Sequence, residues 1–453
     1  MPARVAYRSP EARAVSWLTA HTKERPVAIA AAVVFLLAAF YYSFVLGEVR
    51  FGIHAWYTPV DLWLTLQSAT DAAQGHFSAV YTPYQFVTLP GILVPLTPIS
   101  WLISALHLVR DTPTTSYPHP NAWWLLGPFS WMASAVALFA SDALAQRLGV
   151  GTVRRMLLAG ALIVVLWPAA IIFGHPEDAL ALGLMLYGFL FAFEGRWTGA
   201  GWLLGVALAV QPLVVVAFPV MLAWSGARHW RGLLLRGAIP PVAVVLPPLV
   251  ANFHQTFDTL VKQPTFPLLD HETPWTALAP RIHVVQGFGG GFGVSGGPGR
   301  VVSLVLAVGL GFMAYRWRDR PESILWLLCV ALALRCFTES VMVAYYVLPA
   351  IAVALVLSAA SDPARFGTTL FLGVFLTISA QWQEAWAVWW VLTTVLLAAI
   401  LVTTNPRALA QTRPALVYAA PATDHQRNAA IAARKAANRQ RQRAQRQARS
   451  SRR

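Results

Sequence analysis

Apolar runs of about 20 residues, separated by short polar segments, follow one another along most of this chain. Helices of this length cross the hydrocarbon core of a bilayer, and tryptophan and tyrosine at their ends favour its interfaces. We therefore predict an all-α polytopic membrane protein with about ten spanning helices. The predicted spans cover residues 26–47, 121–145, 154–173, 176–194, 231–252, 301–316, 322–337, 340–359, 365–381 and 384–403.

Two further apolar stretches contain prolines that do not suit an ordinary crossing. Residues 90–108 carry prolines at positions 90, 95 and 98, and we predict a re-entrant or juxtamembrane element there. Residues 199–224 have basic residues near both ends and are interrupted by Gln211-Pro212, which predicts two half-helices that enter the membrane and return. Irregular backbone is tolerated inside a bilayer only where it is buried in protein or lines a wet cavity. Both stretches therefore indicate a cavity in the outer half of the membrane.

Composition and charge support a membrane protein and orient it. Hydrophobic residues make up 57% of the 453 positions and charged residues 12%, whereas soluble domains carry about 25% charged residues. Basic residues cluster at positions 147–155, 196, 228–236, 316–320 and 365, and all of them can face the cytoplasm in one consistent topology. We expect a plasma-membrane protein with both termini cytoplasmic. The predicted parts are a cytoplasmic segment 1–25, a membrane domain 26–405 with outer loops 48–120 and 254–300, and a basic tail 406–453.

The C-terminal tail is strongly basic. Nine arginines and one lysine, with no acidic residue, lie between Arg427 and Arg453. We interpret this segment as a disordered cytoplasmic tail that fixes topology and contacts anionic lipid head groups. Nucleic-acid contact is open to any arginine-rich tail, but no base-reading module accompanies this one, so none is expected.

A carboxylate, Asp61, follows the first span within an apolar and aromatic stretch. At the outer water–lipid boundary, this proton-accepting group could meet a lipid-linked substrate. An N-cap ahead of Leu62 is the structural alternative for Asp61. Asp71, ten residues later, is an alternative acid.

Other polar groups gather in short outer turns. Glu177 and Asp178 follow Pro176 in the first turn of a predicted helix, where favourable interaction with the helix dipole alone could explain them. Arg335 lies one turn inside an apolar helix and requires a partner, which is either Glu339 or a lipid phosphate. The glycine-rich segment 287–299 lacks the frame of a nucleotide-binding loop and reads as a spacer or as a lid.

Three stretches carry a family resemblance. They are residues 61–75 with Val80-Tyr81-Thr82-Pro83, residues 89–98, and Gly174-His175-Pro176-Glu177-Asp178 followed by Gly195-Arg196-Trp197 and Gln211-Pro212. In this order, over residues 25–225, the chain resembles the GT-C superfamily of membrane glycosyltransferases, specifically its bacterial polyprenyl-phosphate-dependent, α-mannosyltransferase-like branch. The segment around Tyr345-Tyr346 resembles the family only in general character.

The resemblance implies an inverting glycosyltransferase. Its donor would be a polyprenyl-phosphate sugar, mannose or another hexose or pentose, and its acceptor a cell-envelope glycolipid or polysaccharide on the outer face. The base of the family maps onto Asp61. Cationic groups should face the leaving phosphate, and the candidates are Arg335, Arg281, His175, His271 and Lys262. The other predicted substrate-binding residues are Glu177, Asp178, Gln211, Tyr81, Tyr84, Glu339, Tyr345 and Tyr346.

No cofactor is expected. Metal-using relatives carry a paired Asp-x-Asp, whereas Leu62 and Trp63 follow Asp61 directly, so the sequence predicts no obligatory metal. Two other functions stay open at this point. A transporter or flippase of lipid-linked sugars would share the cavity, although the unequal outer loops do not indicate inverted repeats. A non-catalytic membrane scaffold would act through its basic tail.

Overall fold

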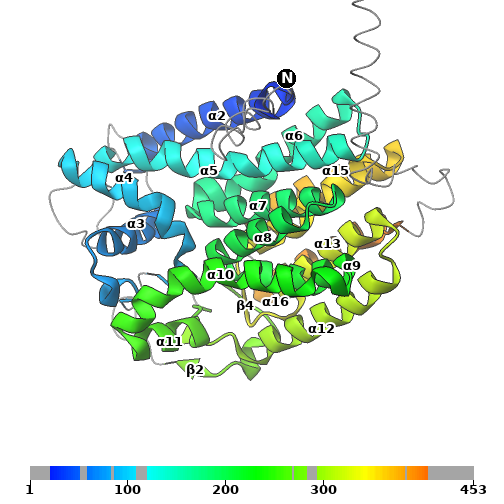
Figure 1. Ribbon diagram of the computed structural model, residues 1–453. Coiled ribbons are helices and arrows are strands. Elements are labelled where there is room, and N and C mark those ends of the chain that lie inside the picture. Colours follow the sequence, from blue (N-terminus) through cyan, green and yellow to red (C-terminus); the bar gives the residue numbers. More distant parts are fainter. Residues whose placement is uncertain are drawn as a thin grey trace, which may run out of the picture. The chain divides into compact units, whose positions relative to one another are not determined.

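The structure is a computed structural model that describes residues 21–51, 59–82, 86–108, 120–267, 270–282, 293–382 and 385–406. The chain up to Pro406 belongs to one compact unit. Nearly all of the predicted basic tail, and residues 287–292 of the glycine-rich segment, lie outside the described residues. Helices dominate the described part (Figure 1).

The α-helices are α2 (Pro26–Phe51), α3 (Val60–Ala73), α4 (Leu93–Ala105), α5 (Pro120–Arg147), α6 (Thr152–Trp167), α7 (Pro176–Phe193), α8 (Trp197–Val210), α9 (Ala217–Ser225), α10 (Ala227–Ala251), α11 (Phe253–Lys262), α12 (Gly297–Arg316), α13 (Pro321–Thr338), α14 (Leu348–Ala359), α15 (Pro363–Ser379) and α16 (Trp386–Thr403). The short helical turns are η1 (Phe77–Ala79), η2 (Pro90–Ile92), η3 (Pro168–Phe173), η4 (Pro212–Val216), η5 (Thr276–Leu278) and η6 (Ala344–Val347). The strands are β1 (His271–Glu272), β2 (Arg281–Ile282), β3 (Gly293–Val294) and β4 (Val341–Met342).

Eight helices of the described part are long and apolar enough to cross a membrane, which confirms the predicted polytopic fold. They are α2, α5, α6 with η3, α7, α10, α12, α13 and α16. The predicted spans 340–359 and 365–381 instead form the shorter helices α14, of 12 residues, and α15, of 17 residues. For α14 the reason is local, because β4 and η6 take up the first residues of the predicted span.

Helices α7 and α14 form the core of the bundle. Every residue of α14 is buried, and so are most residues of α7. The outer helices α10 and α12 expose long apolar faces, including Leu235, Val242, Val305 and Phe312. A helix that is apolar on its exposed face as well as its packed face suits a lipid environment.

Helices α8 and α9 form a hairpin, as the sequence predicts for the two half-helices of residues 199–224. Gly205 in α8 and Phe218 in α9 both pack against Gly237, near the middle of α10. Further along α9, the carbonyl oxygen of Leu222 accepts a hydrogen bond of 2.6 Å from the indole N–H of Trp230. Helix α9 therefore returns along α10 towards the end from which α8 came. The break between the two helices falls at the predicted Gln-Pro pair.

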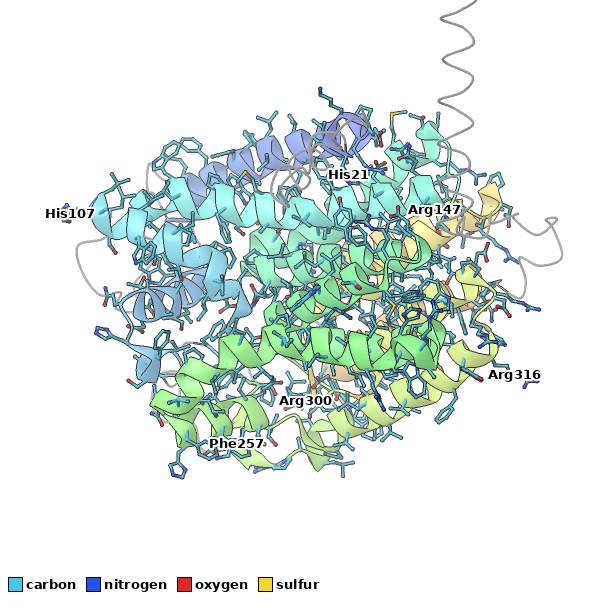
Figure 2. The ribbon with its side chains drawn as sticks, viewed as in Figure 1. His21, His107, Arg147, Phe257, Arg300 and Arg316 are labelled. Atoms are coloured by element: carbon cyan, nitrogen blue, oxygen red, sulfur yellow. The ribbon has the colours of Figure 1, made fainter. Side chains whose placement is uncertain are left out.

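Residues 90–108 form a short element as well. Turn η2 and the 13-residue helix α4 pack against α3, α5, α8 and α10. In Figure 2, His107 after α4 and Phe257 in α11 lie at one edge of the molecule, and Arg147 and Arg316 at the opposite edge. Arg147 and Arg316, two of the basic residues that the charge pattern assigns to one side of the membrane, thus lie at the same edge.

Two small β-ladders fasten the connection between α11 and α12. Strand β1 pairs with β4 in antiparallel register, with His271 opposite Met342. Strand β2 pairs with β3 in the same connection, and Thr265 bridges to Val294. The β1–β4 pairing attaches the connection to the segment that follows α13, and so places its polar residues beside the end of that helix, whereas the other pairings lie within the connection.

Candidate active site

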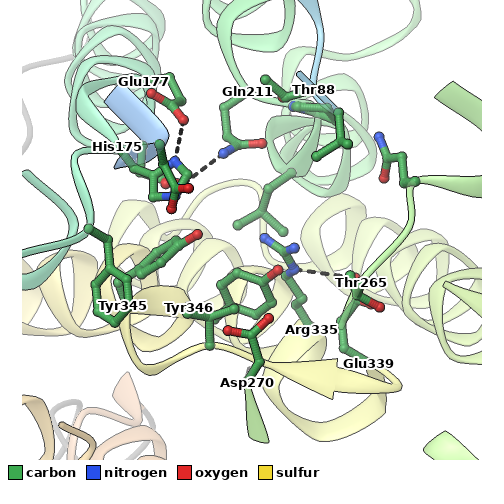
Figure 3. Close-up of a pocket in the computed structure, with 18 of the residues that line it drawn as sticks. Thr88, His175, Glu177, Gln211, Thr265, Asp270, Arg335, Glu339, Tyr345 and Tyr346 are labelled. Atoms are coloured by element: carbon green, nitrogen blue, oxygen red, sulfur yellow. Dashed lines mark hydrogen bonds and ion pairs between the residues drawn. The ribbon is translucent and has the colours of Figure 1, made fainter. Parts of the chain in front are cut away.

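A cavity of about 580 Å³ lies where the predicted outer segments meet the hairpin tip. The start of α3, the turn before α7, turn η4, residues 263–270, the start of α12, the end of α13 and η6 supply its walls. Among the predicted site residues, the structure brings together Asp61, His175, Glu177, Asp178, Gln211, Arg335, Glu339, Tyr345 and Tyr346 (Figure 3). Segments more than 250 residues apart in the chain therefore share one site.

The turn before α7 is built around a glycine. Gly174 has φ of 75°, and a Cβ at this position would lie 2.6 Å from the Cβ of Pro59. Only glycine combines this left-handed conformation with so close an approach. Because the backbone passes directly over the start of α3, the next residue, His175, reaches Asp61.

His175 lies between two carboxylates. Its Nε2 is 3.1 Å from Oδ2 of Asp61, and its Nδ1 is 2.6 Å from Oε1 of Glu177. Ionised carboxylates only accept hydrogen bonds, so an imidazolium that donates from both nitrogens satisfies both contacts. Burial lowers the pKa of His175, but the charge of Glu177 and the hydrogen bonds to both carboxylates outweigh it and raise the pKa well above 6.5. The side chain of Asp61 is 47% exposed to the cavity and solvent, whereas that of Glu177 is 5% exposed.

A second buried carboxylate adjoins this trio. Gln211, at the tip of the hairpin, donates a hydrogen bond of 2.7 Å from Nε2 to Oδ1 of Asp178. Within the described part of the chain, Oε2 of Glu177 and Oδ2 of Asp178 are buried and accept no hydrogen bond. One donor atom each from His175, Glu177 and Asp178 lie within 4.8 Å of one another, so these three residues could hold a metal ion.

Two arginines share one carboxylate at another wall of the cavity. Nε of Arg335 lies 3.2 Å from Oε1 of Glu339, and Nε of Arg300 lies 3.3 Å from both oxygens of that carboxylate. The Cζ atom of Arg335 also lies 3.3 Å from the ring centroid of Tyr346, a cation–π contact. The predicted partner Glu339 is thus present, and two guanidinium groups against one carboxylate leave a net positive charge here.

Arg300 was not among the predicted site residues. A Cβ on Gly299 would lie 1.7 Å from the carbonyl oxygen of Thr338, so the start of α12 touches the end of α13. This contact, possible only for glycine, brings Arg300 beside Glu339. The sequence contains the pair Gly299-Arg300 at the end of the glycine-rich segment, but nothing in it indicates which helix the pair meets.

Asp270 and Tyr345 complete the polar lining. The ring centroid of Tyr345 lies 4.8 Å from that of His175. Asp270 lines the same cavity, and burial, followed by the negative charge of Asp61, raises its pKa to about 7. Asp270 was also missed, because it lies in an irregular loop without hydrophobic periodicity.

Four predicted binding residues do not line this cavity: Tyr81, Lys262, His271 and Arg281. Tyr81 is buried, and its hydroxyl donates a hydrogen bond of 2.9 Å to the carbonyl oxygen of Thr88. His271 stacks on Trp389 with ring centroids 3.7 Å apart. Both side chains therefore serve packing near the cavity and do not face it.

The other two are surface cations. Lys262 forms an exposed ion pair of 2.6 Å with Asp258 one turn earlier in α11. Arg281 is exposed in β2. Tyr84 lies outside the described residues.

Asp61, Glu177 and Asp178 do not cap a helix through their side chains. The N-cap of α3 is Pro59, and Asp61 in the first turn makes no capping hydrogen bond. Asp71 lies about 15 Å further along the same helix and is not part of the cavity wall. Glu177 and Asp178 likewise make no side-chain cap for α7, and they bind His175 and Gln211 instead.

Comparison with known families identifies the chain. The sequence model of glycosyltransferase family 87 matches residues 116–344, just over half of the 453 residues. The chain belongs to glycosyltransferase family 87. This is a GT-C family of membrane glycosyltransferases, as the sequence predicts, and membership implies transfer of a sugar from a donor to an acceptor. No curated protein matches the chain.

The matched segment includes most of the polar cavity wall of this family 87 glycosyltransferase. His175, Gln211, Arg300 and Arg335 all fall within it, whereas Asp61 precedes it. Family membership favours a transferase over the transporter and scaffold alternatives.

Proposed function

We propose that this family 87 glycosyltransferase transfers a sugar, mannose or another hexose or pentose, from a polyprenyl phosphate to a cell-envelope glycolipid or polysaccharide. The reaction inverts the anomeric carbon on the extracytoplasmic face of the plasma membrane. Asp61 is the general base. The single observation that carries the proposal is that a partly exposed carboxylate and an arginine pair line one cavity at the edge of a membrane bundle.

Each step of the transfer has a residue suited to it. The acceptor oxygen attacks the anomeric carbon as the bond from that carbon to the phosphate oxygen breaks, and the bonding electrons leave with the phosphate. The proton of the acceptor hydroxyl passes to Asp61. His175 holds one oxygen of that carboxylate at 3.1 Å, which leaves the other oxygen to face the acceptor.

The leaving phosphate requires positive charge, which Arg300 and Arg335 can supply. Glu339 fixes both arginines through their Nε atoms. The terminal nitrogens of Arg300 donate to Gln263, with Nη1 2.7 Å from its Oε1 and Nη2 3.4 Å from its carbonyl oxygen, so a phosphate would share or replace these contacts. Arg335 binds Glu339 through Nε, which leaves its terminal nitrogens to donate to the phosphate. Charge-assisted hydrogen bonds from arginine to phosphate are stronger than neutral ones and are strengthened further in a site shielded from water. Arg335 is 17% exposed and Arg300 23% exposed, so both are largely shielded.

The apolar walls favour a lipid-linked donor. Val215 in η4 and Leu304 in α12 line the cavity, and they are also 38% and 43% exposed on the surface of the bundle. A cavity that is polar inside and opens between apolar side chains can hold a sugar phosphate while its hydrocarbon chain stays in the membrane. A water-soluble nucleotide sugar would not need such an opening.

The substitution Asp61→Asn tests the proposal. The amide keeps the shape of the carboxylate but cannot accept the proton, so we expect the rate of sugar transfer to fall by about 10²–10⁴-fold. The protein is purified in detergent and assayed with a polyprenyl-phosphate sugar and membrane acceptor lipids. Its Tm and gel-filtration profile should match those of the wild type.

Asp71→Asn is the matched control, because it makes the same change on the same helix outside the cavity. It should retain transfer. Full turnover by Asp61→Asn, or an equal loss in Asp71→Asn, would remove Asp61 from the reaction.

A further inference from the structure

Glu177 and Asp178 present an electrostatic problem that the transfer reaction does not solve. Both residues are buried, at 4% and 6% exposure, and they are neighbours in the chain. Each has one oxygen that accepts a hydrogen bond and one buried oxygen for which the described residues supply no partner. Buried charges are normally paired or bound to a metal ion, because removing them from water is costly.

The groups that line the cavity also carry an excess of negative charge. Its walls carry five carboxylates, from Asp61, Glu177, Asp178, Asp270 and Glu339, against the guanidinium groups of Arg300 and Arg335. Even with His175 as an imidazolium and Asp270 protonated, four carboxylates outnumber three cations. An anionic phosphate that approaches the two arginines would therefore be repelled by the carboxylates of the acidic wall. A cation bound at the acidic wall would reduce that repulsion.

We propose that His175, Glu177 and Asp178 form a binding site for a divalent cation. One donor atom from each of the three residues lies within 4.8 Å of the others. The proposed ligands are Nδ1 of His175, which already faces Glu177 at 2.6 Å, and one oxygen of each carboxylate. Small side-chain rotations bring such atoms to the metal–ligand distances of about 2.0–2.2 Å. One nitrogen and two carboxylate oxygens suit a cation that accepts mixed ligands, such as Mn²⁺. Water or a donor phosphate would fill the remaining positions.

The surroundings of His175 fit this role. Histidines that bind metal through one ring nitrogen commonly donate the other N–H to a carboxylate, which fixes the orientation of the ring. Here Nε2 of His175 faces Oδ2 of Asp61 at 3.1 Å. The cation takes the place of the Nδ1 proton, and the contact from Nε2–H to Asp61 is unchanged. The cation site itself does not depend on the proposed transfer reaction. Two consequences of it do: the cation would orient Asp61 through His175, and it would reduce the repulsion of the donor phosphate.

The binding site can be tested without any substrate. Full-length protein in detergent is treated with a chelator and then titrated with Mn²⁺, and the loss of the free-ion signal is followed by electron paramagnetic resonance. Changes in outer partners of metal ligands already weaken metal binding by about 10–100-fold. We therefore expect Glu177→Gln and Asp178→Asn, which alter direct ligands, to weaken Mn²⁺ binding by at least that factor.

Asp270→Asn is the matched control, because it removes a carboxylate from the same cavity outside the proposed ligand set. It should bind one Mn²⁺ with nearly unchanged affinity. Two ligand variants are used so that misfolding of one, detected by gel filtration, leaves the other informative. Mn²⁺ should also raise the Tm of the wild type and leave that of the ligand variants unchanged, because only a ligand bound to the folded state stabilises it.

The proposal is overturned if the wild type binds no Mn²⁺, or if Asp270→Asn loses as much affinity as the ligand variants. The second result would mean that Mn²⁺ is attracted to the acidic cavity as a whole and is not bound by these three residues. Failure here is distinct from failure of the proposed function. A protein that binds no Mn²⁺ but requires Asp61 for transfer loses only the cation site, whereas a protein that binds Mn²⁺ and does not require Asp61 loses only the transfer mechanism.

Discussion

Two buried clusters in the described part of the bundle contain carboxylates, and they differ in how completely the carboxylate oxygens are paired. In the first, Asp142 of α5 receives hydrogen bonds of 2.7 Å from both Nε and Nη2 of Arg155 in α6. Arg25, just before α2, adds a contact of 3.3 Å. Both oxygens of Asp142 are therefore used. In the second, Glu177 and Asp178 each keep a buried oxygen without a partner among the described residues.

The difference separates a structural role from a functional one. The Asp142 cluster joins three helices, and Asp142 is 3% exposed and is not part of the cavity wall. The Glu177–Asp178 cluster lines the cavity beside the proposed base. A fold gains little from buried carboxylates that lack partners, so such groups point to a ligand that completes them.

The largest expected effect on stability comes from breaking the first cluster. Asp142→Asn leaves two buried guanidinium groups without a negative partner, which typically costs about 3–5 kcal/mol. We expect a clearly lower Tm in detergent. Asp178→Asn is the same chemical change in the second cluster and should lower the Tm much less, because it relieves repulsion from Glu177. Equal losses of Tm in the two variants would erase the distinction between the clusters.

A smaller and more specific effect is expected for Arg335→Ala. A hydrogen bond to a charged group contributes about 1.5–3 kcal/mol, so the KM for the polyprenyl-phosphate donor should rise by roughly 10–100-fold. The KM for the acceptor should change much less. Steady-state kinetics with each substrate varied in turn measures both values.

Arg281→Ala is the control for this kinetic test, because Arg281 is exposed in β2 and does not line the cavity. Its donor KM should match that of the wild type. An unchanged donor KM in Arg335→Ala would restrict Arg335 to its ion pair with Glu339.

Much of the fold and one side of the candidate site could be predicted from the sequence. The length of the continuous apolar runs determines which segments become membrane helices, and Gln211-Pro212 marks the tip of the hairpin because proline cannot continue a helix there. Asp61, His175 and Glu177 were also predicted as site residues, and the structure places them in contact. Their catalytic and binding roles stay predictions.

The other side of the site could not be read in the same way. Asp270 and Arg300 reach the cavity because two-residue strands and a close approach at Gly299 position them, and elements this short leave no periodic pattern. His271 was expected in the site as one of the cationic groups that could face the leaving phosphate. The structure turns its ring onto Trp389 instead. Tertiary contacts of this kind decide which of two neighbouring polar residues faces a cavity.

The most direct test of the central claim is a structure of Asp61→Asn with a polyprenyl-phosphate sugar bound, because this variant should hold the donor without turning it over. We expect the donor phosphate within about 3 Å of a guanidinium nitrogen of Arg300 or Arg335, with the anomeric carbon facing residue 61. A phosphate bound elsewhere, or a sugar turned away from residue 61, would contradict it.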